Sequence, residues 1–408
     1  MVPDGWKIAV LDQLCKKIYV GLATSVTPFM RERGVKLIRN QNIKRNAFNE
    51  SSIVYISPEF AAENQSKMVK AGDVVAVRTG SNIGEACVIP SSFENALTFT
   101  TLIARPDPRY LDSFYLSAHI NSDIGISEVN RLMAGGGKPN LNSGELKKYE
   151  ILVPSLTEQR EIARVLSTWD QAIATIEQLM EKSHQQKKAL MQQLMTGKKR
   201  FSSFTDAWKK ITLGELIKEV KRPVIWDDNT EYKLLSVKRR SEGVVLRETL
   251  FGHQILTKKM NVTHAGDFLI SKMQVVHGAM GLVTHQYHCH HVSDSYICLT
   301  AKDENKIDMG FLAWHCKQKS IYHKAFLCSY GVHIEKMTFN FNSFLKETIK
   351  IPPCIEEQRA IAAALNSADR EIEAQQTKLS CLKQEKKALM QQLLTGKRRV
   401  KLDELEVA

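Results

Sequence analysis

Apolar residues recur every three to four positions along two long stretches of the chain, and this spacing places them on one stripe of a helix. The stripe of the first stretch comprises Ile162, Val165, Leu166, Trp169, Ala172, Ile173, Ile176, Leu179, Met180, Leu190 and Leu194. The stripe of the second comprises Ile361, Leu365, Ala368, Ile372, Leu379, Leu382, Leu389 and Leu393. Both stretches are therefore predicted to be amphipathic helices, the first running from Thr157 to Thr196 over about 60 Å.

Helix start and stop signals frame both stretches. Proline precedes the first turn of each, and Ser155 with Glu158 has the spacing of a capping box. Gly197 and Gly396 stand where a residue in the left-handed conformation commonly ends a helix, and basic residues follow them.

The two predicted helices are near-copies, displaced by 199 positions. Residues 185–200 read Q-Q-K-K-A-L-M-Q-Q-L-M-T-G-K-K-R, and residues 384–399 read Q-E-K-K-A-L-M-Q-Q-L-L-T-G-K-R-R. No single small domain buries so long a stripe, so the simplest partner of each helix is the other, in an antiparallel pair resembling a coiled coil. Two unrelated core helices are the alternative, but burial alone would repeat only the apolar spacing. The repeated polar residues are predicted to face solvent and to bind a common partner: Lys187, Lys188, Gln192, Gln193, Lys386, Lys387, Gln391 and Gln392.

Two globular segments, 1–153 and 201–351, alternate with the helical segments 154–200 and 352–408. Ala265-Gly-Asp267 of the second globular segment matches Ala71-Gly-Asp73 of the first. The sequence thus predicts an α+β tandem duplication, with two mixed α/β domains separated by two long antiparallel helices in pseudo-two-fold symmetry. In the first domain, strands are expected at 35–39, 52–56, 73–77 and 86–89, and helices at 58–70 and 110–120.

Composition favours a globular protein with a polyanionic partner. Of the 408 residues, 43% are apolar, which is enough to bury two or more cores. No apolar run of membrane-spanning length and no signal peptide are recognisable. Eight unpaired cysteines fit a reducing cytoplasm, and a formal net charge of +13 makes nucleic acid the leading candidate for a partner.

These features together resemble one known family. A variable domain, then a Glu-Gln-Arg motif (Glu158-Gln159-Arg160) that begins a long helix ending in Thr-Gly-Lys, then a second variable domain and the same helix again, resemble the specificity (S) subunit of Type I restriction–modification systems. The resemblance covers nearly the whole chain.

The resemblance implies a fold and a function. Each variable domain would be a target recognition domain that reads one half of a bipartite, asymmetric site in double-stranded DNA. The helices would space the domains and bind two modification subunits, which methylate adenine with S-adenosylmethionine. Restriction subunits that use ATP and Mg²⁺ would complete the complex in the cytoplasm of a bacterium or archaeon. This chain would supply only the recognition of the DNA sequence.

The residues themselves also indicate that catalysis takes place elsewhere. The chain lacks a glycine-rich cofactor loop at a strand end and the Asn-Pro-Pro motif of base-flipping methyltransferases. The loop Gly135-Gly-Gly-Lys138 is followed by Pro139, whereas a phosphate-binding loop needs Ser or Thr there. No catalytic residue, cofactor or metal is therefore assigned to this chain.

A histidine-rich segment, His285-Gln-Tyr-His288-Cys-His290-His291, suggests zinc but has poor ligand spacing. If the segment is a strand, His288 and His290 lie on one face and Cys289 and His291 on the other. Surface or DNA-facing histidines are the favoured interpretation.

Candidate DNA contacts come from polar loops, because Arg and Lys suit guanine edges and phosphates while Asn and Gln suit adenine. The first domain offers Arg78, Thr79, Ser81, Asn82, Lys138, Asn140 and Asn142. The second offers Lys238, Arg239, Arg240, Lys272, Gln274, His277, His333 and Lys336. For each of them, a solvated loop residue is the competing interpretation.

For the chain as a whole, the alternatives are a DNA-binding regulator or architectural protein that dimerises through its helices, and an enzyme whose site the sequence does not reveal.

Overall fold

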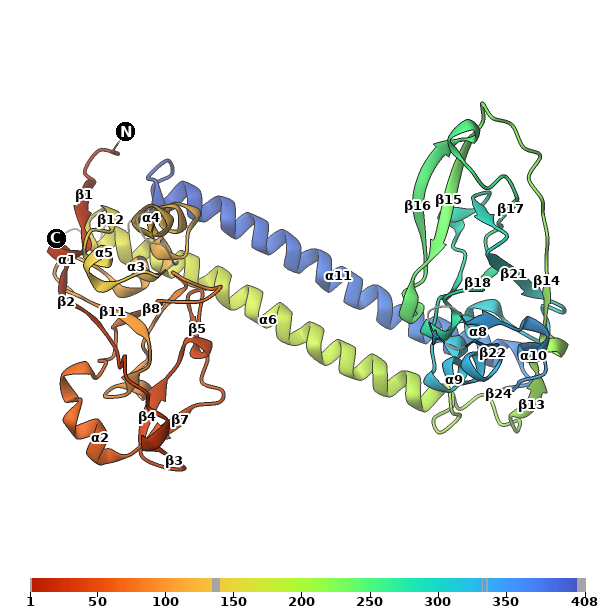
Figure 1. Ribbon diagram of the computed structural model, residues 1–408, viewed down its shortest axis with the longest axis horizontal. Helices are drawn as coiled ribbons and strands as arrows, with labels where there is room; N and C mark the ends of the chain where they lie inside the picture. Colours follow the sequence, from red (N-terminus) through yellow and green to blue (C-terminus); the bar gives the residue numbers. More distant parts are fainter. Residues whose placement is uncertain (1, 134–139, 332, 335–336, 402–408) are drawn as a thin grey trace. The chain divides into compact units, whose positions relative to one another are not determined.

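The computed structural model describes residues 2–133, 140–331, 333–334 and 337–401 (Figure 1). The chain divides into two compact units, of which the first is built from two separate parts of the sequence and the second from one. Unit 1 comprises Met1–Leu179 with Gln375–Ala408, and unit 2 comprises Met180–Ala374. Each unit therefore holds one globular domain and one half of each long helix.

The domain of unit 1 has, over the described residues, two four-stranded sheets and two two-stranded ones. The first sheet has the order β2-β11-β8-β9, and the second has the order β10-β4-β7-β3, in which β10 and β4 are parallel. β1 pairs with β12, and β5 pairs with β6. The strands are β1 (Lys7–Val10), β2 (Cys15–Val20), β3 (Met30–Arg31), β4 (Val35–Ile38), β5 (Ile43–Lys44), β6 (Ala47–Phe48), β7 (Val54–Ile56), β8 (Val74–Val77), β9 (Ala86–Val88), β10 (Leu97–Thr98), β11 (Thr101–Pro106) and β12 (Glu150–Val153).

In this domain α1, α3 and α5 pack on the first sheet, and α2 packs on the second. Asp112 begins α3 by accepting from the backbone N–H groups of Phe114 and Tyr115, as a side-chain N-cap does. β8 is buried at all four positions, which fits its uninterrupted Val-Val-Ala-Val run. The helices are α1 (Leu11–Leu14), α2 (Pro58–Glu63), α3 (Ser113–Ile120), α4 (Asp123–Met133) and α5 (Ser143–Lys147).

The domain of unit 2 repeats the strand order of the first sheet, as the tandem duplication predicts, but its second sheet matches that of unit 1 in only three strands. Its fourth strand, β17, lies beside β20, the counterpart of β10, whereas β3 lies beside β7. Its sheets have the orders β14-β21-β18-β19 and β16-β15-β20-β17, and β13 pairs with β24 as β1 does with β12. Its strands are β13 (Lys209–Thr212), β14 (Ile217–Glu219), β15 (Glu231–Val237), β16 (Val244–Phe251), β17 (Met260–Val262), β18 (Phe268–Ser271), β19 (Met280–Leu282), β20 (His291–Ser293), β21 (Tyr296–Ala301), β22 (Ser329–Tyr330), β23 (Thr338–Phe339) and β24 (Thr348–Ile351). Its helices are α7 (Leu213–Leu216), α8 (Met309–Cys316), α9 (Lys319–Leu327) and α10 (Phe341–Leu345).

Two long helices, α6 (Leu156–Leu194) and α11 (Ile355–Leu394), confirm the main prediction from the apolar stripe. Gly197 and Gly396 follow them with φ of +70° and +67°, the left-handed conformation expected of a helix-ending glycine. The predicted capping box is only half formed. Oγ of Ser155 accepts from the backbone N–H of Glu158 over 3.3 Å, but the Glu158 carboxylate binds elsewhere.

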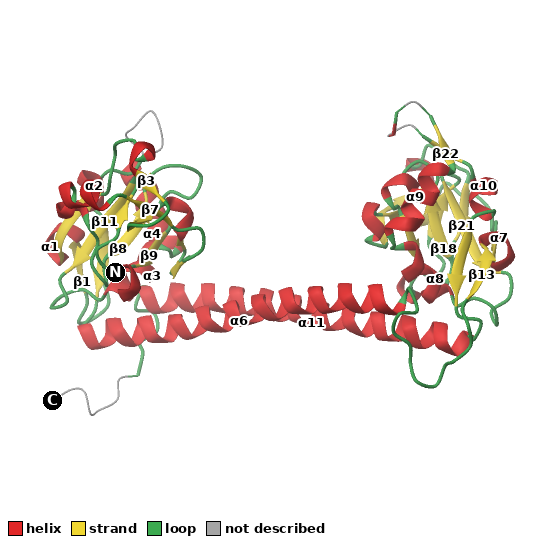
Figure 2. Cartoon of the chain, turned by 90° about the horizontal axis from the view of Figure 1, so that it is seen from below, coloured by secondary structure: helices red, strands yellow, loops and turns green. Residues whose placement is uncertain are grey.

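Within each unit, the halves of α6 and α11 lie side by side and run antiparallel (Figure 2). In unit 1, Glu158 pairs with Arg399 and Asp170 pairs with Lys386. A later residue of α6 therefore meets an earlier residue of α11, as in an antiparallel pair. Leu166 and Leu393 join the core of the neighbouring domain. In unit 2, Leu194, Ile361 and Leu365 do the same.

The four predicted strands match β4, β7, β8 and β9 to within two residues, whereas β2 and β11, the other strands of the first sheet, were not predicted. The short helices were predicted less accurately. The helix expected at 58–70 stops at Glu63 and gives way to a 3-10 turn, Gln65–Lys67. The helix expected at 110–120 begins at Ser113, because Asp112 is its cap. No helix in the part of the chain described is long and apolar enough to traverse a bilayer.

Candidate nucleic-acid interface and helix faces

In unit 1, the loop between β8 and β9 lies against the segment before α5, so two candidate DNA-contacting stretches meet. Nε of Arg78 donates to Oδ1 of Asn140 over 3.1 Å, and the backbone N–H of Leu141 donates to the carbonyl of Arg78 over 3.2 Å. Arg78 is half-buried, and the other candidates of these stretches are exposed: Thr79, Ser81, Asn82 and Asn140. A guanidinium beside an amide offers the donors and acceptors that base edges match.

Two further residues of this surface differ from expectation. Asn142 is exposed, but its Oδ1 accepts from the backbone N–H of Glu145 over 2.9 Å and caps α5, a role that sequence analysis did not assign. Asn40 was not predicted, yet its Nδ2 donates to the carbonyl of Thr79 over 3.5 Å. The run of three polar residues at 40–42 is the feature of the sequence that could have identified Asn40 as a candidate. Lys138 lies outside the described residues.

In unit 2, the corresponding loop joins β18 to β19 and contains the 3-10 turn η7 (Val275–His277). It lies against the β15–β16 turn, which contains η5 (Arg239–Ser241). The backbone N–H of Ser241 donates to the carbonyl of Gly278 over 2.8 Å, and the hydroxyl of Tyr322 donates to Oγ of Ser241 over 2.7 Å. One surface therefore gathers most second-domain candidates, of which Lys238, Arg239, Arg240 and Lys272 are exposed and Gln274 and His277 are half-buried.

His333 and Lys336 are the remaining second-domain candidates. His333 is exposed. Lys336 lies outside the described residues. Lys272 donates from Nζ to the carbonyl of Asp294 over 2.6 Å, which fixes its ammonium at the edge of the surface.

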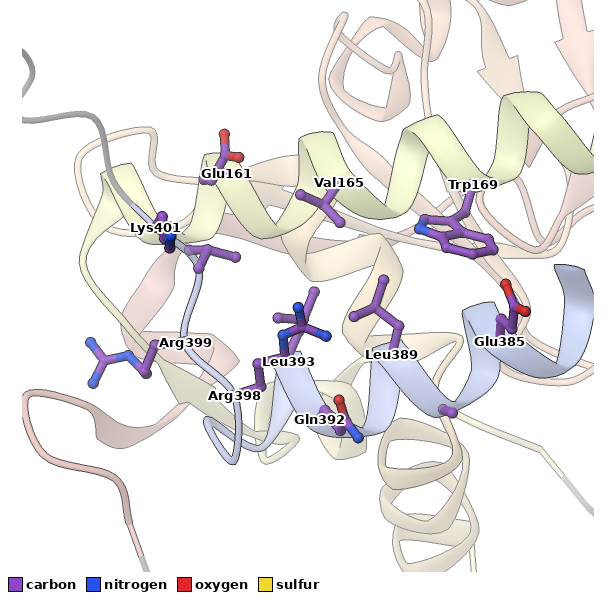
Figure 3. A pocket seen from close by; sticks show the side chains of 12 residues that line it. Glu161, Val165, Trp169, Glu385, Leu389, Gln392, Leu393, Arg398, Arg399 and Lys401 are labelled. Carbon is purple, nitrogen blue, oxygen red and sulfur yellow. The ribbon is translucent and has the colours of Figure 1, made fainter.

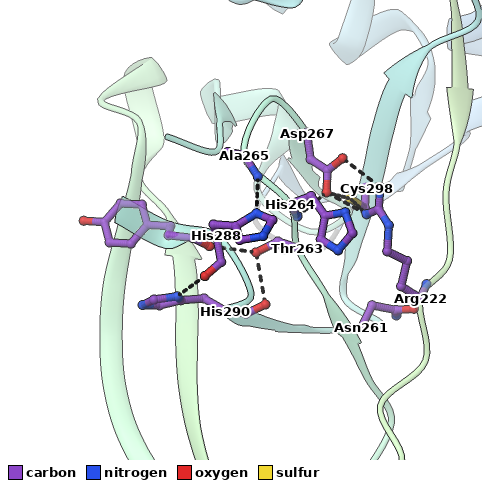
Figure 4. A network of polar contacts seen from close by, with 10 residues as sticks. Arg222, Asn261, Thr263, His264, Ala265, Asp267, His288, His290 and Cys298 are labelled. Atoms are coloured by element: carbon purple, nitrogen blue, oxygen red, sulfur yellow. Dashed lines mark hydrogen bonds and ion pairs between the residues drawn. The ribbon is translucent and has the colours of Figure 1, made fainter. Parts of the chain in front are cut away.

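The Ala-Gly-Asp motif of each domain is structural. Oδ1 and Oδ2 of Asp73 both accept from Arg105 at 2.8 Å. Asp267 accepts from Arg222 at 2.7 and 3.2 Å (Figure 4). Each carboxylate also accepts from the backbone N–H three residues earlier. Asp73 and Asp267 are buried, so each anchors the turn that precedes β8 or β18 and does not face solvent.

The histidine-rich segment is not a strand, which differs from the alternation considered in the sequence analysis. A 3-10 turn, His285–Tyr287, begins it, Cys289 has φ of +59°, and β20 starts only at His291. Nδ1 of His288 accepts from the backbone N–H of Ala265 over 3.2 Å (Figure 4). Within the residues described, no group of three or more His, Cys, Asp or Glu side chains is placed to hold a metal ion.

Lys187 and Lys386 face the opposite helix of their unit, so the prediction that they face solvent is wrong. Lys187 pairs with Asp369, and Lys386 pairs with Asp170. Burial raises the pKa of Asp170, and the neighbouring Lys386 ammonium opposes that shift. These lysines lie at the border of the apolar stripe, where a long side chain covers apolar surface while its head meets a carboxylate.

The other repeated polar residues are exposed, and their role in partner binding stays a prediction. They are Lys188, Lys387, Gln192, Gln193, Gln391 and Gln392. Lys387 forms an open ion pair with Asp123 at 3.1 Å, in which both side chains are more than half exposed. Such a pair contributes little to stability.

The Glu-Gln-Arg motif has an internal role that sequence analysis missed. Nε2 of Gln159 donates to the carbonyls of Pro154 and Tyr110, each over 3.0 Å, and Oε1 accepts from the backbone N–H of Asp112. Gln358 makes the corresponding three bonds in unit 2. The repeated glutamine therefore fastens each long helix to its own domain.

Comparison with known proteins agrees with this geometry. A sequence model of the Type I restriction modification DNA specificity domain matches residues 3–182 and again 205–384. A Methanocaldococcus jannaschii protein provisionally named the specificity subunit of type I restriction enzyme MjaX is 24% identical, over 98% of this chain and 95% of its own. The MjaVIII specificity subunit of the same organism is 25% identical, over 83% and 82%.

Solved structures show the same fold. The Type I restriction–modification system S subunit from M. genitalium matches with a TM-score of 0.61 at 15% identity, over 95% of this chain and 96% of that one. The HsdS subunit from Thermoanaerobacter tengcongensis matches with a TM-score of 0.50 at 15% identity, over 97% and 98%. With two copies of the domain covering most of its length, this chain belongs to the Type I restriction modification DNA specificity family.

Proposed function

We propose that this chain is the DNA-specificity subunit of a Type I restriction–modification complex, in which each domain reads one half of a bipartite, asymmetric site. The duplication carries this proposal. The two domains share the order of the first sheet and three strands of the second, and the helices 199 positions apart are near-identical, whereas the loops at the candidate surfaces differ. A protein with two copies of one scaffold and different loops on each copy is suited to binding two different DNA sequences.

The loops offer different chemistry in the two domains. The Arg78–Asn140 pair of unit 1 combines a guanidinium, which suits guanine, with an amide, which suits adenine. The η5–η7 surface of unit 2 combines three consecutive basic residues at 238–240 with Gln274 and His277. Basic side chains bind phosphates and position the protein, while amides and bidentate arginine distinguish bases. Unlike half-sites are therefore expected.

The helices are proposed to set the spacing of the two domains and to bind two modification subunits through the repeated exposed faces. Those subunits would transfer a methyl group from S-adenosylmethionine to adenine, and restriction subunits would use ATP and Mg²⁺. This chain would contribute no catalytic group. The complex would act on double-stranded DNA in the cytoplasm of a bacterium or archaeon.

The test compares the purified chain with the chain assembled with its modification subunit. Alone, the chain should transfer no methyl groups, cleave no DNA and hydrolyse no ATP. Assembled, the complex should methylate adenines within one bipartite site, mapped by sequencing of methylated DNA. Methyl transfer by the isolated chain, or methylation without a bipartite pattern, contradicts the proposal.

A further inference from the structure

The helix pair carries a groove in each unit, and the two grooves occupy the same place in the repeat. The groove of unit 1 has a volume of about 690 Å³ and is lined on α11 by Ala388, Leu389 and Gln392 (Figure 3). The groove of unit 2 has a volume of about 440 Å³ and is lined on α6 by Ala189, Leu190 and Gln193. These are the same three residues, 199 positions apart.

The opposite walls of the two grooves differ. In unit 1, α6 contributes Val165 and Trp169, and in Figure 3 the indole points toward α11, between Leu389 and Glu385. In unit 2, α11 contributes Ala364 and Ala368, the residues at the equivalent positions. A groove walled by valine and tryptophan offers an incoming side chain far more apolar surface than one walled by two alanines.

The rims differ in charge as well. Arg398 and Lys401, which follow α11, line one end of the unit 1 groove, and Glu385 lies near Trp169 at the other end (Figure 3). Glu161 also lines this groove. In unit 2, Lys187 lines the groove but is paired with Asp369, and Glu371 also contributes. Trp and Arg are the residues that most often dominate binding energy when they lie at the centre of an interface.

We infer that the two grooves are unequal binding sites for two copies of the same modification subunit, and that the unit 1 groove fills first. This inference rests on the proposed function and concerns the order in which its partners bind. The matching surface of the partner is an apolar or aromatic side chain that contacts Trp169, with a carboxylate toward Arg398 and Lys401 at the other end of the groove. The shared Leu389 and Leu190 positions let the same surface bind in unit 2, with less apolar contact.

Titration of the full chain with its modification subunit, followed by native mass spectrometry and calorimetry, tests the inference. Two steps are expected, the first tighter by about tenfold or more, which is the scale of a single aromatic anchor. At one equivalent of partner, hydrogen exchange should slow at 385–393 and not at 186–193. Trp169→Ala should weaken the first step by about tenfold, and Ala368→Trp should strengthen the second.

The control is Trp226→Ala, which removes an indole that stacks on Tyr232 in the second domain and is remote from either groove in sequence. It should leave both steps unchanged, and circular dichroism checks that each variant is folded. Two equal steps in the unaltered chain, or a Trp169→Ala variant that keeps its tight step, would overturn the inference and leave the proposed function intact. Loss of the second step in Ala368→Trp would also overturn it, because the indole would then obstruct the groove. Failure of the unaltered chain to bind the subunit would overturn the proposed function itself.

Discussion

Glu158, in the first turn of α6, is held by Arg399, which follows the end of α11. Nε and Nη2 of Arg399 donate to the two carboxylate oxygens over 2.5 and 2.8 Å, and Nε1 of Trp6 donates to the same carboxylate. Glu357 and Arg200 form the same bidentate pair in unit 2, at 2.8 and 2.7 Å. The start of each repeated helix is therefore fastened by the residue that follows the end of the other.

This cross-repeat pair should contribute measurably to stability. Glu357 is fully buried, so removal of its charge by Glu357→Gln leaves Arg200 without its carboxylate in a partly buried place. The expected result is a fall of about 5 °C or more in the unfolding temperature of unit 2, measured by calorimetry. Glu177→Gln is the matched control, since its pair with Lys383 is half exposed and should matter little. Equal effects of the two changes would show that burial of the pair is not what counts.

Stability should fall in acid because of two buried histidines at corresponding helix ends. Burial lowers the pKa of His119 to about 4, and its Nδ1 lies 2.9 Å from the hydroxyl of Tyr149. Burial likewise lowers the pKa of His315 to about 4. Between pH 6.5 and 4 the unfolded chain binds protons that the folded chain does not, so stability is lost as the pH falls through this window. The loss should reach about 3 kcal/mol per histidine by pH 4.

Denaturant titrations of His119→Gln between pH 7 and 4 check this expectation. The variant should be less stable than the unaltered chain at pH 7, and its stability should depend less on pH. His184→Gln, an exposed change on α6, should reproduce the pH dependence of the unaltered chain. A His119→Gln variant with an unchanged pH slope would show that the acid sensitivity lies elsewhere.

The exposed glutamines are the better test of partner binding, because Lys187 and Lys386 already hold the helix pair together. Changing Gln192, Gln193, Gln391 and Gln392 to Arg should lower the affinity for the modification subunit at least tenfold, about 1.4 kcal/mol. Thermal stability should change little, since surface changes are usually within about 0.5 kcal/mol. Gln171→Arg with Gln178→Arg, exposed but not repeated, should leave assembly intact. Undiminished assembly by the fourfold variant would mean that these residues are only solvated.

The sequence was informative wherever the repeat and the helical period acted together. The apolar stripe and the glycines at 197 and 396 located α6 and α11, and the repeated Ala-Gly-Asp motif identified two domains that share the order of their first sheet. The repeat did not reveal, however, which side chains face the partner helix and which face solvent. Lys187 and Gln192 are both repeated, yet one faces a carboxylate of the partner helix and the other faces solvent.

Contacts within the candidate site were beyond sequence reasoning because they join distant segments. The Arg78–Asn140 bond spans 62 residues, and the Ser241–Tyr322 bond spans 81. Local periodicity carries no information about such contacts. The capping role of Asn142 could have been predicted, because an Asn before Ser-Gly-Glu has the spacing of an N-cap. Its position in a polar loop favoured a DNA contact instead.

Helix length should set the distance between half-sites. Removing one heptad from each helix, 171–177 and 370–376, leaves the Asp170–Lys386 and Lys187–Asp369 pairs in register. Seven residues span about 10 Å, which corresponds to up to roughly three base pairs at about 3.4 Å each. The methylated site should therefore keep its half-site bases and lose up to about three spacer base pairs. New half-site bases with the old spacing would contradict the proposed division of roles.

The central claim is that each domain reads its own half-site, and replacement of one domain by a copy of the other tests it most directly. A hybrid in which residues 1–153 replace residues 201–351 should assemble with the modification subunits, because it keeps both long helices. Sequencing of the methylated adenines that this complex makes is the measurement. The account predicts a palindromic target built from two copies of the first half-site, and an unchanged asymmetric target would contradict it.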